Sequence, residues 1–384
     1  VVCTHATRDL CAIMLADSGH IHEHDTKTFN KKRARQGLPP IEPIYTKEDA
    51  VESMALFYSV PYDRKMRIDD HIKVKFTNTG HMLGSGVANI EIRENSHIKK
   101  IAYTGDIGRP TNRILKAPVD FPQADILITE STYGDRLHTK HEDAEEMLLN
   151  IVHETCVKKG GKLIIPSFSV GRTQEICYSL NNFYNERRLP KVDIYVDSPL
   201  AMNATDVFRL HPECFNKNIL DVMLTDPDPF GFNSLFYTRS ADDSKKLNDI
   251  GRPCVIISAS GMMEAGRVKH HLANSISNPR NTVLAVGYCA PSTLGAKILR
   301  GEKAVSIHGT VYEVRADIKR LDSYSGHGDY YEMIDFLKCQ NPQKLEKLFL
   351  VHGEEDTQVK YKITLEEAGF SNIEIPAAGE VFEI

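Results

Sequence analysis

Five apolar stretches of this sequence each end in a histidine or an acidic residue that stands next to a glycine or a serine. In chain order these residues are His81, Asp106, Glu130, His327 and His352. A side chain at the end of a strand is held by rigid backbone and still faces a cleft, which suits a metal ligand. Any one of them alone is more often an ordinary turn residue. The five together predict a single site assembled from distant parts of the chain.

The blocks around these residues, and several others, occur in a fixed order between about residue 77 and residue 356. They read GHMLGS, TGDIGR, ESTYGDR, PSFSVGRTQE, DSPLA, SGMMEAGR, GYCAPSTLG, SGHGD and LVHGEE. This series resembles the metallo-β-lactamase fold, and specifically its β-CASP branch of nucleic-acid-cutting enzymes. Within that branch it is most similar to the group that contains the endonuclease subunit of the pre-mRNA 3′-end cleavage machinery and its bacterial relatives.

The resemblance implies an α/β protein: an N-terminally incomplete αββα metallo-β-lactamase sandwich with an inserted parallel-sheet β-CASP domain. The expected segments are 1–136 for the first part of the lactamase domain, 137–320 for the insertion and 321–384 for the return. The pattern of apolar residues supports this independently. A strand at 163–165, a helix at 173–184 and a strand at 192–196 form a βαβ unit, which requires a parallel sheet. A chain of 384 residues is long enough for two such domains.

The family's main ligand motif, His-x-His-x-Asp-His, is missing from this sequence. Residues 19–25, GHIHEHD, are similar in composition, but His24 and Asp25 stand in the reverse order. We interpret His20, His22 and His24 as part of a solvated, polar helix start; the alternative is an adventitious metal site. In the family, the segment THATRDL already lies beyond the motif. We therefore expect a truncation rather than a true loss, and a chain that is hydrolytically inactive as printed.

The resemblance assigns roles to the residues at the strand ends. His81 would bind one zinc ion, His352 a second, and Asp106 would bridge the two. His327, held by Glu130, would act as the general acid, since a neighbouring carboxylate favours imidazolium. Hydrolysis of RNA would then give a 5′-phosphate and a 3′-hydroxyl. Imidazole and carboxylate ligands suit zinc, and paired metal ions activate water and clamp phosphate oxygens.

Candidate substrate-binding residues follow the strands of the inserted sheet, where open α/β sheets bind ligands. Arg172 stands at a helix start and would hold a phosphate, unless it pairs with Glu175 or Asp197. Ser260 would contact substrate or cap a helix. The remaining candidates are Gly261 and Thr293. We expect His270 and His271 to lie on a helix surface.

Composition limits the other possibilities. The chain is 41% hydrophobic and 26% charged, and its net charge is −5. We therefore do not expect the overall charge of the protein to attract nucleic acid. Metal ions and local cations can still bind the phosphates. The eight cysteines form no C-x-x-C pair and are interpreted as reduced thiols. The sequence contains no apolar run of membrane-spanning length and no signal peptide. We therefore expect a cytoplasmic location and no association with a membrane.

Three further functions remain open at this level. The first is a non-catalytic RNA-binding or scaffold subunit that keeps the fold. The second is a DNA-processing nuclease of the same branch, and the third a hydrolase of small esters, which would not need the inserted domain. The basic run KKRAR at 31–35 is interpreted as a solvated face or, alternatively, as an edge that contacts RNA.

Overall fold

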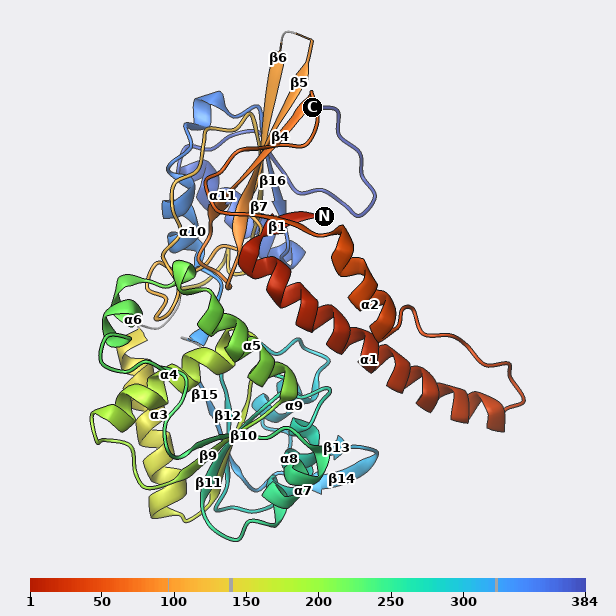
Figure 1. Ribbon diagram of the computed structural model, residues 1–384, viewed down its shortest axis with the longest axis vertical. Helices are drawn as coiled ribbons and strands as arrows, with labels where there is room; N and C mark the ends of the chain where they lie inside the picture. The colour runs from red at the N-terminus through yellow and green to blue at the C-terminus, as the bar shows by residue number, and fades with distance from the viewer. Residues whose placement is uncertain (96, 138–140, 322–323) are drawn as a thin grey trace.

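The computed structural model describes residues 1–95, 97–137, 141–321 and 324–384, and it contains two large sheets in separate lobes (Figure 1). The lobe at the top of the view contains a seven-stranded sheet, and the lower one a six-stranded sheet. A long N-terminal helix, α1, begins between the lobes and projects away from both. No helix among these residues has both the length and the apolar character that crossing a membrane requires.

The seven-stranded sheet has the order β17-β16-β7-β6-β5-β4-β3. Strands β6, β7, β16 and β17 run parallel, and the β3 to β6 portion is an antiparallel meander. One face packs on α10 and α11 around a core that includes Leu127, Leu348 and Met333. The bounds are β3 Met66–Arg67, β4 Ile72–Asn78, β5 Gly86–Glu94, β6 His97–Tyr103, β7 Ile126–Glu130, α10 Tyr330–Leu337, β16 Lys347–Val351, α11 Glu355–Glu367 and β17 Ile373–Glu374, with a 3-10 turn at Pro342–Lys344.

The opposite face of this sheet is apolar but only partly covered. Phe76, Ile90, Ile101 and Ile128 point to this side and are each only half-buried, and Tyr103 is 45% exposed. In an αββα sandwich this face packs on a second sheet. Among the described residues the only additional strands in this lobe form a two-stranded parallel sheet of β1 (Val2–Thr4) and β2 (Tyr58–Val60). The strand order and the helices on the first face agree with the predicted lactamase domain.

The six-stranded sheet is entirely parallel, in the order β10-β9-β11-β8-β12-β15. Helices cover both of its faces and enclose two separate cores. The predicted βαβ unit is confirmed. The bounds are α3 His141–Val152, a π-helical turn His153–Lys158, β8 Lys162–Pro166, α4 Arg172–Asn185, β9 Asp193–Asp197, α5 Pro199–Leu210, a 3-10 turn Pro212–Cys214, α6 Lys217–Val222, β10 Leu235–Tyr237, α7 Ala241–Asp249, β11 Cys254–Ser258, α8 Val268–Ser275, β12 Thr282–Ala285, α9 Leu294–Leu299, the hairpin β13 Ala304–Ile307 and β14 Thr310–Glu313, and β15 Asp317–Arg320.

The N-terminal helix passes through the segment that was interpreted as a helix start. Helix α1 runs without a break from His5 to Arg35, so GHIHEHD lies in its middle. A Cβ at Gly19 would come within 2.7 Å of the Thr46 carbonyl and the Lys47 amide. The glycine therefore allows α2 (Lys47–Ser53) to pack closely, and a 3-10 turn at Met54–Leu56 follows. The expectation of a solvated segment is correct, since His20 and His24 are exposed.

Two other expectations are wrong. The sequence predicts one helical stripe of Ala144, Met147, Leu148, Ile151 and Val152 on α3, but Met147 is 45% exposed. His271, predicted to lie on a helix surface, is fully buried because it hydrogen bonds Asn248 through Nδ1 and Asp197 through Nε2. All eight cysteines are free thiols, as expected.

Asp197, at the end of β9, is the centre of a buried polar network. Its side chain is fully buried, accepts hydrogen bonds from Ser244 and Arg267, the latter at 2.7 Å, and pairs with His271 at 2.7 Å. Burial alone would raise the pKa of this carboxyl, but the hydrogen bonds lower it below its usual value. The network ties β9 to α7 and α8, and so fixes the loops at this edge of the sheet.

We predict that Asp197→Asn lowers the free energy of unfolding at neutral pH by about 3 kcal/mol, because it breaks a buried ion pair. Since the folded-state pKa is lowered, the difference from wild type should be full above pH 3.8 and shrink as pH falls through the folded-state pKa below it. Urea titrations measure this. Asp193→Asn, at the other end of the same strand, is the control, because its partner Arg252 is 66% exposed and the expected loss is under about 1 kcal/mol. Equal losses of unfolding free energy in the two variants would contradict the view that the buried network of Asp197 stabilises the fold.

Candidate active site

The loop that follows β6 is the centre of the site, because it lies between two other loops. The Gly108 N–H donates to the Thr79 carbonyl at 2.8 Å, which joins this loop to the one carrying His81. On the other side, the Gly328 N–H donates to the Ile107 carbonyl at 2.8 Å, and Gly108 forms a β-bridge with His327. Backbone hydrogen bonds therefore bring together three loops that are far apart in sequence.

Glycine is required where these loops touch. A Cβ added to Gly108 would lie 2.1 Å from the carbonyl carbon of Gly80 and 2.3 Å from the amide nitrogen of His81. A Cβ on Gly326 would come within 3.0 Å of the His81 ring. These contacts are with backbone or a buried ring, which cannot move aside at low cost. The position of His81 thus depends on the absence of side chains in its neighbours.

The three predicted metal ligands lie together. Asp106 stands between two imidazoles: its Oδ2 is 3.6 Å from Nε2 of His81, and its Oδ1 is 3.0 Å from Nδ1 of His352. The His81 side chain is 10% exposed, Asp106 37% and His352 56%. Burial, with a smaller effect from His327, lowers the pKa of His81 to about 4. Its ring is therefore neutral at ordinary pH, which is the form that binds metal.

The backbone of His352 is held in an unusual conformation. Its φ is 53°, in the left-handed region that residues with a side chain rarely adopt. The Thr132 hydroxyl donates to the His352 carbonyl at 3.0 Å and lies 3.2 Å from its Nδ1. Ser131 donates to the Val351 carbonyl at 2.7 Å. These contacts from the end of β7 fix the direction of the His352 ring.

Glu130 and His327 form a separate pair beside the ligands. Nδ1 of His327 lies 3.0 and 3.2 Å from the two carboxylate oxygens of Glu130, which is 1% exposed and also accepts the Ile107 N–H. Burial would raise the pKa of Glu130, but the contacts with His327 and Thr132 lower it overall. Burial would likewise lower the pKa of His327, but the hydrogen bond to Glu130 raises it above its ordinary value. The pair favours a carboxylate and an imidazolium.

The donor set fits a metal centre. Donor atoms of Asp106, Glu130, His327 and His352 all lie within 4.8 Å of one another. Among these, the Glu130 oxygens already accept hydrogen bonds from His327 and a backbone N–H. His81 is outside this group of four, but its Nε2 lies 3.6 Å from Asp106. His81, Asp106 and His352 could therefore hold a metal ion, and nitrogen and oxygen donors of this kind are typical zinc ligands.

The substrate-binding candidates have local partners. Arg172, at the start of α4, pairs with Glu175 at 2.5 Å, which is one of the two partners that the sequence suggested. Its guanidinium lies 5.9 Å from the ring centre of Tyr324. Its positive charge is close enough to His327 to oppose the rise in the pKa of that histidine. Asn112 donates to Glu175 at 3.1 Å, so this carboxylate links the two lobes. Asp197, the other suggested partner, binds Arg267 instead.

Ser260 and Thr293 hold loops together. The Ser260 hydroxyl exchanges hydrogen bonds with the amide and carbonyl of Ala265, at 3.3 and 3.2 Å, so it closes a loop and does not cap a helix. Thr293 is the N-cap of α9 and accepts the Ala296 N–H at 3.2 Å. Gly261 lies against the ring of Phe168, 2.9 Å from where its Cβ would be.

Sequence reasoning missed two residues that build the site. Thr132 orients His352, and Gly108 allows the loops to meet. Thr132 and Gly108 lie inside recognised blocks, ESTYGDR and TGDIGR, yet neither has a chemically reactive side chain. Only their contacts reveal what they do.

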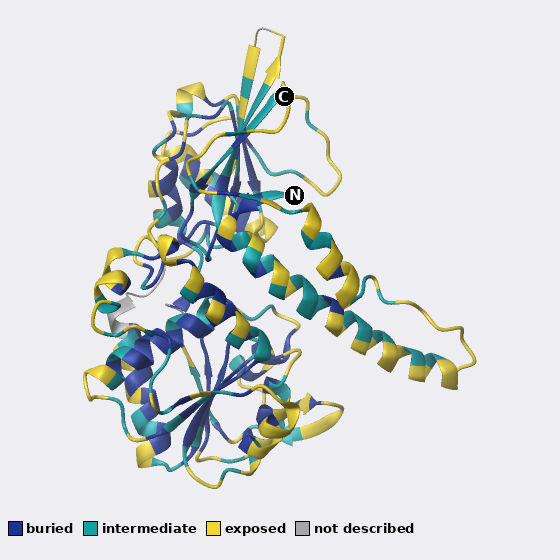
Figure 2. Ribbon diagram, viewed as in Figure 1, coloured by how far each residue is buried: buried dark blue, intermediate teal, exposed yellow. Residues whose placement is uncertain are grey.

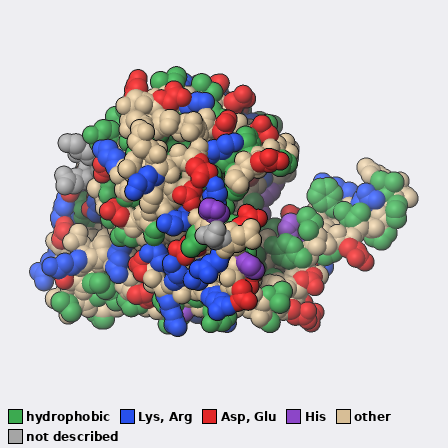
Figure 3. All heavy atoms as spheres, turned by 90° about the horizontal axis from the view of Figure 1, so that it is seen from above, with side chains coloured by type: hydrophobic (Ala, Val, Ile, Leu, Met, Phe, Trp, Pro, Cys, Tyr) green, Lys and Arg blue, Asp and Glu red, His purple; other side chains and the backbone are tan. Residues whose placement is uncertain are grey.

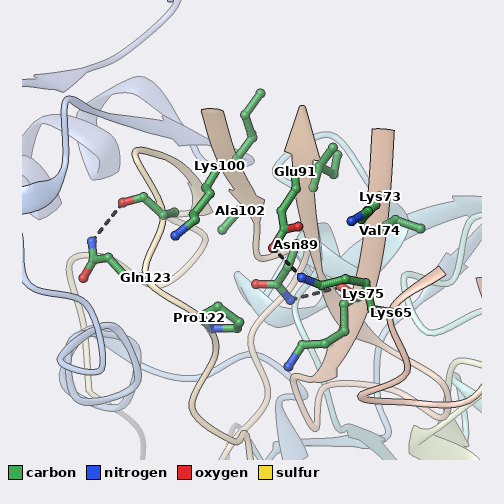
Figure 4. A pocket seen from close by; sticks show the side chains of 13 residues that line it. Lys65, Lys73, Val74, Lys75, Asn89, Glu91, Lys100, Ala102, Pro122 and Gln123 are labelled. Atoms are coloured by element: carbon green, nitrogen blue, oxygen red, sulfur yellow. Dashed lines mark hydrogen bonds and ion pairs between the residues drawn. The ribbon is translucent and has the colours of Figure 1, made fainter. Parts of the chain in front are cut away.

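A pocket of about 240 Å³ on β4, β5 and β6 is distinct from this site (Figure 4). It is lined by Lys65, Lys73, Lys75 and Lys100 around Glu91, and by none of the five residues at the strand ends. Lys65 pairs with Glu91 at 2.7 Å, and Lys75 with Asp63 at 3.3 Å. Two of its four cations are thus already neutralised.

Comparison with known proteins identifies the family of this chain. Residues 173–298 match the Beta-Casp domain, and residues 311–376 match the Zn-dependent metallo-hydrolase RNA specificity domain. An RNase J-like protein of Methanocaldococcus jannaschii is 32% identical over the whole of this chain and 83% of its own length. This chain belongs to the β-CASP family of metal-dependent ribonucleases with the metallo-β-lactamase fold.

Other β-CASP relatives have related names. Ribonuclease TTHA0252 of Thermus thermophilus is 32% identical over 82% of this chain and 70% of its own length. The transcription termination factor FttA of Methanocaldococcus jannaschii is also 32% identical, over 95% of this chain. That match spans only 56% of FttA.

We predict that Gly108→Ala disrupts the site from a position that carries no reactive group. The added methyl would push the Gly80–His81 backbone, at a cost of about 3 kcal/mol or more in the free energy of unfolding. The melting temperature and the bound-metal content measured by mass spectrometry should both fall. Gly251→Ala is the matched control, because nothing lies within 4 Å of its added Cβ. Normal metal binding by Gly108→Ala would show that the close approach does not fix His81.

Proposed function

We propose that the protein is a zinc-dependent ribonuclease that hydrolyses RNA between its two lobes to give a 5′-phosphate and a 3′-hydroxyl. The observation that carries this is the placement of Asp106 between His81 and His352, with His327 and Glu130 beside it. His81 and His352 would each hold one zinc ion and Asp106 would contact both. Bound zinc supplies an activated water and neutralises phosphate charge.

His327 supplies the proton for the leaving oxygen in this proposal. Glu130 fixes the ring through Nδ1, so Nε2 is the nitrogen that would donate. The raised pKa of His327 favours the protonated ring, which a general acid requires. Because Glu130 is buried and already accepts a backbone N–H, its orientation does not depend on substrate.

RNA is the proposed substrate. The match to an RNA specificity domain and relatives named as ribonucleases support RNA over DNA. Arg172 would meet a phosphate at the start of α4, where backbone N–H groups also favour an anion. Ser260, Gly261 and Thr293 would shape the rim of the inserted domain, which we place at 137–320, between lactamase segments 1–136 and 321–384.

We predict that His327→Ala in the full-length protein abolishes RNA cleavage, by about a hundredfold or more, and leaves zinc content nearly unchanged. Single-turnover cleavage of a labelled RNA and mass spectrometry of bound metal measure the two effects. The control is His97→Ala, an exposed histidine at the far end of β6, which should cleave normally. Loss of zinc in His327→Ala would make this residue a ligand and remove it from the acid role.

We predict that Arg172→Ala weakens RNA binding by about tenfold, the value of a charge-assisted hydrogen bond to phosphate. Zinc content should stay within error of wild type. Arg188→Ala serves as the control, because Arg188 follows the same helix but pairs with Glu146 at an exposed position. An unchanged RNA affinity would mean that Arg172 only positions Glu175.

A further inference from the structure

The far end of α1 carries a concentrated positive charge. Between Thr26 and Ile41 the sequence contains five lysines and arginines and no aspartate or glutamate, in a chain whose net charge is −5. Lys27, Lys31 and Arg35 are spaced four residues apart and so lie on one face of the helix. Like charges at this spacing destabilise a helix. The helix dipole favours cations in the last turn, but it does not account for Lys27 and Lys31.

This end of the helix has no part in the protein core. In α1 the buried residues are Ala6, Leu10 and Gly19, and no residue from 20 to 49 is buried (Figure 2). The helix projects from the body, and at 1.5 Å per residue it is about 45 Å long. Its base is attached to the loop after His81, because Thr4 and Thr7 donate to the Gly84 carbonyl at 2.7 and 2.9 Å.

The end of the arm is nevertheless well organised. The side chain of Asn30 exchanges hydrogen bonds with the Ile41 backbone, at 2.8 and 2.9 Å, and Arg33 donates to the Pro39 carbonyl at 2.8 Å. These bonds fold the following loop back onto the helix. The Arg33 guanidinium is therefore partly occupied by a hydrogen bond within the protein. Lys27, Lys31, Lys32 and Arg35 form no ion pair with any residue that the structure describes.

An aromatic ring stands among these cations. Phe29 is 58% exposed, and the Lys32 ammonium lies 6.0 Å from its ring centre. Figure 3 shows lysine and arginine side chains together with apolar ones at the far end of the arm. Cations along a track with an exposed ring for base stacking are typical of surfaces that bind single-stranded nucleic acid without sequence preference.

We propose that the tip of α1 is a second contact for single-stranded RNA, outside the active site. Lys27, Lys31, Lys32 and Arg35 bind backbone phosphates, and Phe29 stacks on a base. The proposal deepens the proposed function and rests on it for the choice of RNA as ligand. The distance along α1 has a consequence: only an RNA long enough to reach from the cleft to the tip gains from both contacts. At about 3.4 Å per phosphate in a stacked strand, this requires more than about ten nucleotides.

The test uses the full chain with Lys27, Lys31, Lys32 and Arg35 all changed to glutamine, leaving Arg33 in place. Fluorescence anisotropy measures binding of labelled single-stranded RNAs of roughly 5 and roughly 30 nucleotides at several salt concentrations, with chelator present so that no cleavage occurs. The matched control changes four exposed lysines elsewhere to glutamine, with the same change in net charge: Lys158, Lys217, Lys303 and Lys344. Circular dichroism checks that both variants are folded.

The arm variant should bind the longer RNA about tenfold more weakly, and its plot of log affinity against log salt should be less steep by about 3. The control variant and binding of the short RNA should be unchanged. A second variant, Phe29→Ala, should weaken binding of the longer RNA about fivefold without changing the salt dependence.

Three results would overturn the proposal: an arm variant that binds the longer RNA normally, an equal loss in the arm and control variants, or a change in oligomeric state in sedimentation with RNA affinity intact. The last would make the arm a protein interface. Absence of cleavage by the metal-loaded full-length protein would instead count against the proposed function. It would not affect the difference in RNA affinity between the arm variant and the control variant.

Discussion

The close contact of three loops at Gly108 is the constraint on which the site depends. The loop after β6 has neighbours on both sides, with backbone hydrogen bonds to Thr79 and from Gly328. There is room for no side chain where it meets Gly80. As a result, residues from three distant blocks face one another, and Asp106 stands between two imidazoles. The reactive groups are placed by backbone packing and not by their own attraction.

The pair of Glu130 and His327 has a different physical basis. Glu130 is nearly fully buried at the end of β7, where an unpaired carboxylate would be costly. The Ile107 N–H and His327 satisfy it, so the desolvation cost is offset by a fixed geometry. The same two partners occupy its oxygens, although the donor atoms of Asp106 and His352 lie within 4.8 Å of them. Glu130 is thus buried and hydrogen bonded within the protein, whereas the Asp106 side chain is 37% exposed.

The sequence predicted much of this protein, and the failures have physical reasons. The parallel sheet followed from apolar runs, and the five strand-end residues followed from block order; the structure places them together. Residues 19–25 were interpreted as a helix start because they are polar, whereas they lie in the middle of α1, where Gly19 permits α2 to pack closely. His271 was misplaced because its partner Asp197 is 74 residues away. The contacts of Thr132 with His352 likewise depend on tertiary structure, which no local pattern encodes.

The central claim is that His81, Asp106 and His352 hold metal while His327 does not. Crystals of the full-length protein grown with zinc, measured at the zinc absorption edge, test it most directly. We predict anomalous peaks about 2.0 to 2.2 Å from the donor atoms of His81, Asp106 and His352. His327 should keep its hydrogen bond to Glu130. A peak bound by His327, or no zinc next to Asp106, would contradict the account.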